Sequence, residues 1–538
     1  MKKTKKLLML LLALVLVFSL AACGGGTTAP VEEPEESEEP EAEEPEGEEE
    51  QEAEEEVRTD LNMVVQAEPV GFNPLKTNDS ASSRVNVQMY ETLFVRSFDG
   101  QSYEPLLAES YTNPDDTTWV IKLKEGITFH DGTPFNAEAV KYSFERIMDP
   151  EYGSARASLM ATVESVNALS EYEVEIKTKA PDGVMLAKLA HANGAIASPT
   201  AEQNQDLMAQ PVGTGPYKFV EFESGSHVIL EANEDYWNGA PFIKNVRIDI
   251  VPEISTAISK LETGESDWFE GITAEHLSRV QNMSGVKLVS ELSGRVTYLG
   301  VRANSSKTGS TEIPEVREAI SYALDKQGFV ATQNGLAVPS DSLVGPKVFG
   351  YTEDSESYGT GFDMEMAKQI VEENNLSDKP IHILASNSSF YPEIAEWVQA
   401  SLLEAGFKEV EIEMMEWGAF LSETTQENRM DIFPLGWSNL TGDGSELFYP
   451  NWHSDNIGGG NRSYYQNPEF EEYVNASQTT LDMAERLEAL DMANKTIVED
   501  NGVYPIMHSN NVYAYAEDLQ NVEMDPGGNF YIKLVTRK

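Results

Sequence analysis

The chain has 538 residues, of which 91 are acidic and 38 are basic, so its formal net charge at pH 7 is −53. A surface this negative argues against binding to nucleic acid or to an anionic membrane. Cys23 is the single cysteine, which excludes a disulfide bond within the chain.

The first 22 residues have the pattern of a secretory signal peptide. Four lysines precede an apolar run from Leu7 to Ala22, and about 16 residues are too few for a comfortable membrane span. The run ends in Leu20-Ala-Ala-Cys23, which resembles a bacterial lipobox. This resemblance implies that Cys23 is lipidated and becomes the first mature residue. A buried structural cysteine is the poorer alternative directly behind such a segment.

Residues 23–56 predict an acidic, disordered tether behind the lipidated cysteine. The segment carries 17 glutamates, no basic residue and little apolar content. Such a chain buries too little surface to offset the entropy of ordering, and its like charges repel. A specific acidic binding tail is the alternative to a simple tether.

The remainder, residues 57–538, predicts a folded α/β protein of two or three lobes. About 480 residues exceed one ordinary core. With 74 acidic and 34 basic residues this part keeps a net charge of −40. Alternating apolar residues predict strands, and 3.6-residue apolar stripes predict helices between them. Predicted strands are 61–65, 171–176, 246–250, 410–414 and 431–435; predicted helices include 254–262, 316–324, 394–405 and 483–497.

The most informative stretch is Leu106–Met148. Trp119, Ile121 and Leu123 alternate with polar positions, as in a strand with one buried face. His130-Asp-Gly-Thr-Pro134 is typical of a turn, because Gly132 tolerates positive φ and proline interrupts strand pairing. Asn136 is a good cap for a following helix. The residues alone therefore predict a strand, a turn and a helix, with His130 as a structural histidine.

This stretch closely resembles the signature of the family 5 extracellular solute-binding proteins, the peptide- and nickel-binding components of ABC importers. The resemblance returns at Pro211–Tyr217, Asn233–Gly239 and Val316–Leu324, so it covers almost the whole mature chain. It implies a two-lobed periplasmic-binding-protein fold of type II, in the large peptide-binding class with an extra subdomain in the first lobe.

The same resemblance implies the domain boundaries. Behind the signal peptide (1–22) and the lipidated tether (23–56), the first lobe is expected at 57–92 and 213–298, with its extra subdomain at 93–212. The second lobe is expected at 299–505, and the chain returns to the first lobe at 506–538.

No catalytic or metal-binding motif is present. The seven histidines show no pair at metal-ligand spacing, and there is no zinc-protease motif or serine nucleophile elbow. Gly213-Thr-Gly-Pro-Tyr217 lacks the lysine-serine ending of a phosphate loop, so a tight entry into a strand is the preferred interpretation. We therefore expect no enzyme activity, no cofactor and no metal.

The candidate ligand-binding segment is the loop Gly436–Gly444, which follows a predicted strand. Loops at the carboxyl ends of strands are where open α/β sheets bind ligands. In the family, an aspartate of this segment pairs with the peptide's α-ammonium group, and Asp443 is the matching carboxylate. The form W-S-N-L-T-G-D is closest to the glutathione- and short-peptide-binding branch. An ordinary turn at Asp443-Gly444 and a core role for Trp437 are the alternatives.

The resemblance thus predicts a set of ligand contacts: Asp443, Trp437, Asn439 and Thr441 in this loop, and Trp417, Asn78, Ser82 and Asn387 by family position. We expect a monomeric lipoprotein on the outer face of the cell membrane, which captures a small peptide and delivers it to permease subunits with cytoplasmic ATPases. Alternatives are a nickel chelate, haem, an opine or an oligosaccharide as the ligand, a peptide-sensing receptor, and a peptidase.

Overall fold

The structure, a computed structural model, describes residues 58–388, 390–439 and 441–538. Cys23 and the tether therefore lie outside the described residues. We call residues 58–298 and 506–538 the first lobe, and residues 299–505 the second lobe. No helix within the described ranges is long and apolar enough to span a bilayer.

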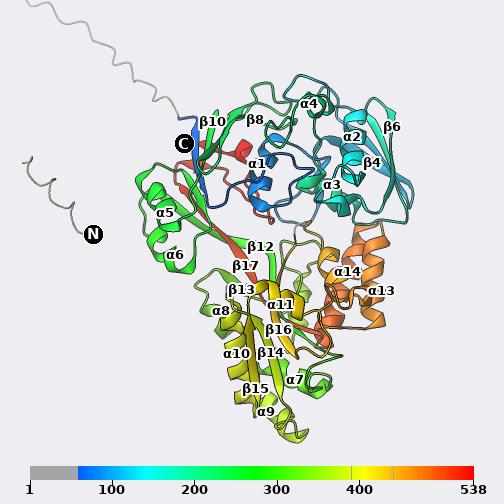
Figure 1. Cartoon of the computed structure of the whole chain (residues 1–538), viewed down its shortest axis with the longest axis vertical. Helices are drawn as coiled ribbons and strands as arrows, with labels where there is room; N and C mark the ends of the chain where they lie inside the picture. Colours follow the sequence, from blue (N-terminus) through cyan, green and yellow to red (C-terminus); the bar gives the residue numbers. More distant parts are fainter. Residues whose placement is uncertain (1–57, 389, 440) are drawn as a thin grey trace, which may run out of the picture. The chain divides into compact units, whose positions relative to one another are not determined.

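One long mixed sheet runs through both lobes (Figure 1). Its strands, in spatial order, are β15 (Val410–Met415), β14 (Ile381–Ser386), β16 (Ile432–Ser438), β12 (Val286–Val301), β17 (Val503–Ala516), β11 (Trp268–Glu270), β1 (Asp60–Val65), β10 (Asn245–Ile250), β9 (His227–Ala232) and β8 (Tyr217–Glu223), with β13 (Ala337–Pro339) paired to β17. The long antiparallel pair β12 and β17 connects the lobes, because its two ends pair with strands of different lobes.

The first lobe carries smaller sheets beside the long one. They consist of β4 (Ala108–Asp115), β5 (Thr118–Leu123), β7 (Glu173–Thr178) and β6 (Val163–Ser170), of β2 (Phe94–Arg96) with β3 (Tyr103–Pro105), and of β18 (Leu519–Gln520) with β19 (Thr536–Arg537). The four-stranded sheet lies within the predicted extra subdomain, but its side chains join the same hydrophobic core as the rest of the lobe.

Helices pack against the sheets within each lobe (Figure 1). In the first lobe they are α1 (Ser80–Met89), α2 (Ala137–Met148), α3 (Met185–Ala190), α4 (Pro199–Asn204), α5 (Ile254–Thr263) and α6 (Ala274–Gln281). In the second lobe they are α7 (Pro314–Ala323), α8 (Lys326–Ala331), α9 (Met364–Glu373), α10 (Tyr391–Ala405), α11 (Trp417–Glu423), α12 (Ser445–Trp452), α13 (Pro468–Thr479) and α14 (Met483–Glu499).

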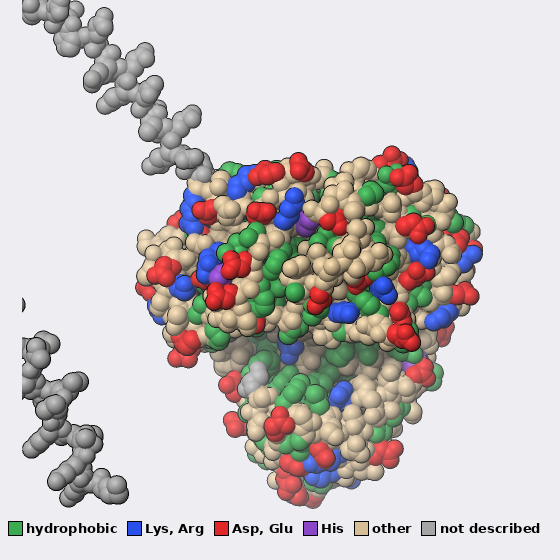
Figure 2. Space-filling model, turned by 45° about the horizontal axis from the view of Figure 1, so that its top comes forward, with side chains coloured by type: hydrophobic (Ala, Val, Ile, Leu, Met, Phe, Trp, Pro, Cys, Tyr) green, Lys and Arg blue, Asp and Glu red, His purple; other side chains and the backbone are tan. Residues whose placement is uncertain are grey.

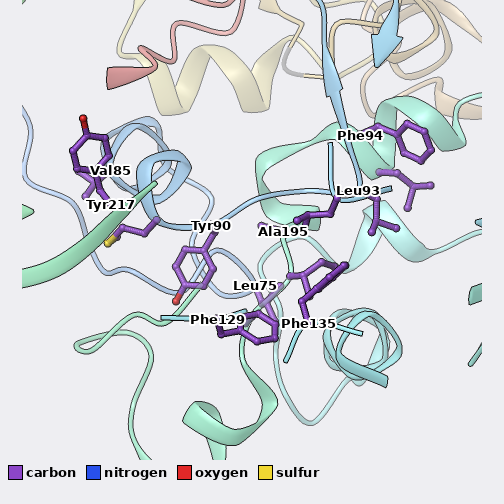
Figure 3. Packing of buried hydrophobic residues seen from close by; sticks show 14 of the residues in the cluster. Leu75, Val85, Tyr90, Leu93, Phe94, Phe129, Phe135, Ala195 and Tyr217 are labelled. Carbon is purple, nitrogen blue, oxygen red and sulfur yellow. The ribbon is translucent and has the colours of Figure 1, made fainter. Parts of the chain in front are cut away.

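The signature stretch folds as its residues predict. Trp119, Ile121 and Leu123 are buried on one face of β5, and the Asn136 side chain caps α2 by accepting from the amide of Ala139. Phe129 and Phe135, which flank the turn, lie edge to face with their ring centroids 6.3 Å apart (Figure 3). The turn is therefore fixed to the core from both sides.

The glycine-rich segment 213–217 is explained by a close approach of two backbones. An added Cβ at Gly213 would lie 2.2 Å from the carbonyl oxygen of Met89, at the end of α1, and Gly215 donates to the same carbonyl. The Nε2 of His130 hydrogen-bonds to the Gly215 carbonyl at 2.8 Å. Burial lowers the pKa of His130 to about 4, so the ring is neutral and structural at pH 7.

Candidate functional site

The described residues enclose a cavity of about 290 Å³ in the first lobe. Its wall comes from α1 and the residues on either side of it, from β2, from the segments around His191 and Arg156, and from the C-terminal residues 525–534. Thr441 is the second-lobe residue in this wall, so the cavity opens toward the loop that follows β16. Figure 2 shows the surface hollowed between the two lobes, with hydrophobic side chains along the hollow.

Several polar atoms of the cavity wall have no hydrogen-bond partner among the described residues. They include both acceptors and donors: Asp79 Oδ2, Asn86 Oδ1, Arg96 Nη1 and Arg156 Nε. Asn86 is 2% exposed, and the other oxygen of Asp79 caps α1 through the amide of Ser82. Since buried polar groups in folded proteins are nearly always paired, this wall is suited to a ligand that offers donors and acceptors.

Glu91 also lies in the wall, but its carboxylate, unlike the atoms above, is hydrogen-bonded within the protein. Its buried carboxylate accepts hydrogen bonds from the Tyr236 hydroxyl at 2.6 Å, the Thr214 hydroxyl at 2.8 Å and the Trp237 indole at 2.9 Å. Burial raises the pKa of Glu91 against these bonds. This carboxylate therefore holds the wall together and has little capacity left for a ligand.

Arg84 lines the cavity and forms an ion pair with Glu270. Burial raises the pKa of Glu270 to about 7, although Arg84 acts to lower it. A carboxyl group with a raised pKa binds more protons in the folded than in the unfolded chain, so its contribution to stability falls as the pH rises from about 4 to about 7.

We therefore expect the unfolding free energy of the wild type, minus that of Glu270→Gln, to decrease from pH 5 to pH 8. Urea unfolding at both pH values measures it, and other titrating groups cancel in the difference. A difference that does not change with pH would show that Arg84 keeps Glu270 ionised throughout.

In the second lobe, aromatic side chains gather at the carboxyl ends of parallel strands. β14 is parallel to β15 and β16, so the residues after all three strands lie along one edge. Trp417 begins α11 just after β15, is 37% exposed, and stacks on Tyr391 with ring centroids 5.7 Å apart. Trp437, near the end of β16, has an indole Nε1 without a partner among the described residues.

The structure separates the sequence-predicted site residues into three groups. Asn78 and Thr441 line the cavity. Trp417, Trp437 and Asn387 lie at the strand ends of the second lobe. Ser82, Asn439 and Asp443 are buried and bonded within the protein.

The bonds of this buried group are specific. The Ser82 hydroxyl accepts from the amide of Val70, and the Asn439 side chain bridges Gly442 and Asp443 within its own loop. The Asp443 carboxylate is 0% exposed and pairs with Arg486 of α14, whose Nη2 lies 2.8 Å from Asp443 Oδ2 and 3.0 Å from Oδ1. In this structure the negative charge of Asp443 is thus already neutralised, and its contact with a ligand stays a prediction.

Sequence reasoning missed Arg96 and Arg156, because no local motif marks either residue. It also missed a cluster outside the cavity, where the β8–β9 hairpin places ligand atoms of Glu221, Glu223 and His227 within 4.8 Å of one another. The cross-strand register of Glu223 opposite His227 creates this cluster.

Comparisons with known proteins agree with this architecture. The family described as "Bacterial extracellular solute-binding proteins, family 5 Middle" matches residues 102–459. The chain is 26% identical to the oligopeptide-binding protein AppA of Bacillus subtilis (strain 168), over 99% of the chain and 98% of AppA. It is 26% identical to the glutathione-binding protein GsiB of Escherichia coli (strain K12), over 88% of the chain and 93% of GsiB.

Solved structures give the same result for the fold. HbpA2 from Haemophilus parasuis superposes with a TM-score of 0.83 at 23% identity, covering 89% of this chain and all of that one. The unliganded open form of the murein tripeptide-binding protein MppA gives a TM-score of 0.79 at 17% identity, covering 89% of this chain and 97% of that one.

Proposed function

Because the chain belongs to family 5 of the bacterial extracellular solute-binding proteins, we propose that it captures a small peptide between its lobes and delivers it to the membrane permease of an ABC importer. The family is a non-enzymatic class of extracytoplasmic binding proteins. Two relatives are named for an oligopeptide and for glutathione, which is itself a short peptide. A peptide is therefore the ligand class that we infer for this chain.

The observation that supports a peptide best is the mixed polar character of the cavity wall. Asp79 and Asn86 offer unpaired acceptor oxygens, whereas Arg96 and Arg156 offer unpaired donors. A peptide carries an ammonium group, amide donors, carbonyl acceptors and a carboxylate, so it can satisfy both kinds of partner. A purely apolar solute would leave these buried atoms unpaired, which costs about 1–3 kcal/mol for each group.

The second lobe would complete the site by closing over the ligand. The aromatic edge formed by Trp417, Tyr391 and Trp437 supplies apolar and stacking surface, and Thr441 already reaches the cavity. Periplasmic binding proteins close by a hinge motion of this kind. A ligand that contacts both lobes shifts the population toward the closed form, and the permease would recognise that form.

The test of this function is mass spectrometry of the small molecules released when the purified protein is denatured. We expect one or more short peptides, recovered intact, and calorimetric titration of the emptied protein with the synthetic peptide should reproduce the binding. Recovery of a metal chelate, haem, an opine or a sugar instead would contradict the peptide assignment. Cleavage of the peptide during incubation would contradict a pure binding role.

We also propose that lipidated Cys23 anchors the protein to the outer face of the cell membrane. Two acyl chains on one cysteine give stable anchoring where a single chain is marginal. The Cys23→Ala variant should therefore leave the membrane fraction or stay unprocessed, as fractionation and intact-mass measurement would show. Unchanged mass and membrane retention would contradict the proposal.

A further inference from the structure

Arg96 and Arg156 differ from the other arginines that the structure describes. Their guanidinium groups make no hydrogen bond and no ion pair with any described residue. Each of the other arginines donates to a carboxylate, a hydroxyl group or a backbone carbonyl of the protein. In a chain in which acidic residues outnumber basic ones by more than two to one, two unpaired arginines in one cavity need an explanation.

Three carboxylates in or beside the cavity wall are bonded to other groups. Asp443 is bonded to Arg486 and Ser445, and Glu446 accepts from the amide and the hydroxyl of Thr441. Asp525 accepts from the Asn529 amide and the Tyr531 hydroxyl. None of these carboxylates forms an ion pair with Arg96 or Arg156, so neither guanidinium group has a counter-charge among the described residues.

The charges of both arginines affect the same residue of the cavity wall, His191. Burial and, after it, the charges of Arg156 and Arg96 lower the pKa of His191 to about 4. His191 also lines the cavity, so the charges of both arginines act on this part of its wall. Buried donor atoms of both guanidinium groups, Arg96 Nη1 and Arg156 Nε, have no partner among the described residues.

Arg96 also reaches the second lobe. An added Cβ at Gly442 would lie 1.4 Å from Arg96 Nη1, so the guanidinium group packs directly on the backbone of the loop after β16. Gly442 has a φ of +74°, which also favours glycine there. A ligand held by Arg96 would therefore lie at the junction of the lobes, next to Thr441.

We infer that Arg96 and Arg156 form a subsite for a carboxylate group of the ligand. The inference rests on the proposed function, since it names the part of a peptide-type ligand that these residues recognise. Each planar guanidinium group presents N–H donors in a fork that matches the two oxygens of a carboxylate. A carboxylate bound there would supply the counter-charge that the two guanidinium groups lack among the described residues.

The direct test uses sodium malonate, a small dicarboxylate, as the probe. The full-length protein is emptied of ligand by unfolding and refolding, and binding is measured by calorimetry at constant ionic strength. We expect the wild type to bind malonate, and Arg96→Gln and Arg156→Gln each to bind it about 10- to 100-fold more weakly, the range for one charged hydrogen bond. Sodium phosphate in a parallel titration distinguishes a carboxylate subsite from a general oxyanion site.

Arg279→Gln is the matched control, because Arg279 is a partly exposed arginine paired with Glu262 and does not line the cavity. It should bind malonate as the wild type does. Equal binding by the wild type and the double variant Arg96→Gln/Arg156→Gln would overturn the inference, and so would absence of malonate binding by the wild type or tighter binding of phosphate. Circular dichroism confirms that each variant is folded.

The mass spectrum of the released ligand separates this inference from the proposed function. A peptide without a free carboxylate would leave the function standing and overturn the subsite. Malonate binding that depends on Arg96 and Arg156, together with a released ligand that is anionic but no peptide, would support the subsite and contradict the peptide assignment.

Discussion

Asp443→Asn should lower the free energy of unfolding by about 3–5 kcal/mol, the range for breaking a buried ion pair by removing one partner. The substitution keeps the shape of the side chain but leaves the guanidinium group of Arg486 buried without a counter-charge. Both side chains are at most 1% exposed, so water cannot replace the lost partner. Urea unfolding followed by circular dichroism measures the loss.

A double variant provides the control for this prediction. Asp443→Leu combined with Arg486→Met removes both charges, and apolar replacement of a complete buried pair is often neutral or stabilising. The double variant should therefore be more stable than Asp443→Asn. If Asp443→Asn instead unfolds like the wild type but loses peptide affinity, the carboxylate serves the ligand's ammonium group, as the family resemblance implies. An N-acetylated peptide would then bind the wild type poorly.

Most of the secondary structure could be predicted because its signals are local. Asn136 caps α2, and the alternation around Trp119 marks β5; each signal lies within a few residues of the element that it specifies. The crossings between the lobes near residues 298 and 505 were implied by the family resemblance and not by a local signal. The ends of the elements were predicted less exactly. The strand expected at 171–176 is β7, Glu173–Thr178, because pairing with β5 and β6 determines where it ends.

The candidate site could be predicted only where it follows a strand end. The loop with Trp437 and Thr441 does follow β16, and Trp417 does follow β15. The partner of Asp443, however, is Arg486 on α14, and 43 positions along the chain separate the two. Sequence alone does not reveal which charges are paired in space. It therefore did not show that Asp443 is paired with Arg486, or that Arg96 and Arg156 have no ion-pair partner among the described residues.

The two lobes also touch away from β12 and β17. The amide of Gly183, just before α3, donates to the carbonyl of Gln478 in α13 at 2.7 Å, and Leu481 packs against the first-lobe core. In Figure 1 the orange α13–α14 pair lies beneath the part of the first lobe that carries α3. Arg486 also lies at this contact between the lobes. Its ion pair with Asp443 therefore links the loop after β16 to the contact.

Gly183→Ala should break this contact and separate the lobes. The added Cβ would lie 2.1 Å from the carbonyl oxygen of Thr480, a backbone atom that cannot move aside cheaply, and overpacking of this kind costs about 1–3 kcal/mol. We expect a larger radius of gyration by small-angle X-ray scattering and faster release of the bound peptide. Gly459→Ala is the control, since its Cβ would meet nothing closer than the Asn456 carbonyl oxygen at 3.3 Å. An unchanged radius and release rate in Gly183→Ala would show that β12 and β17 alone set the separation of the lobes.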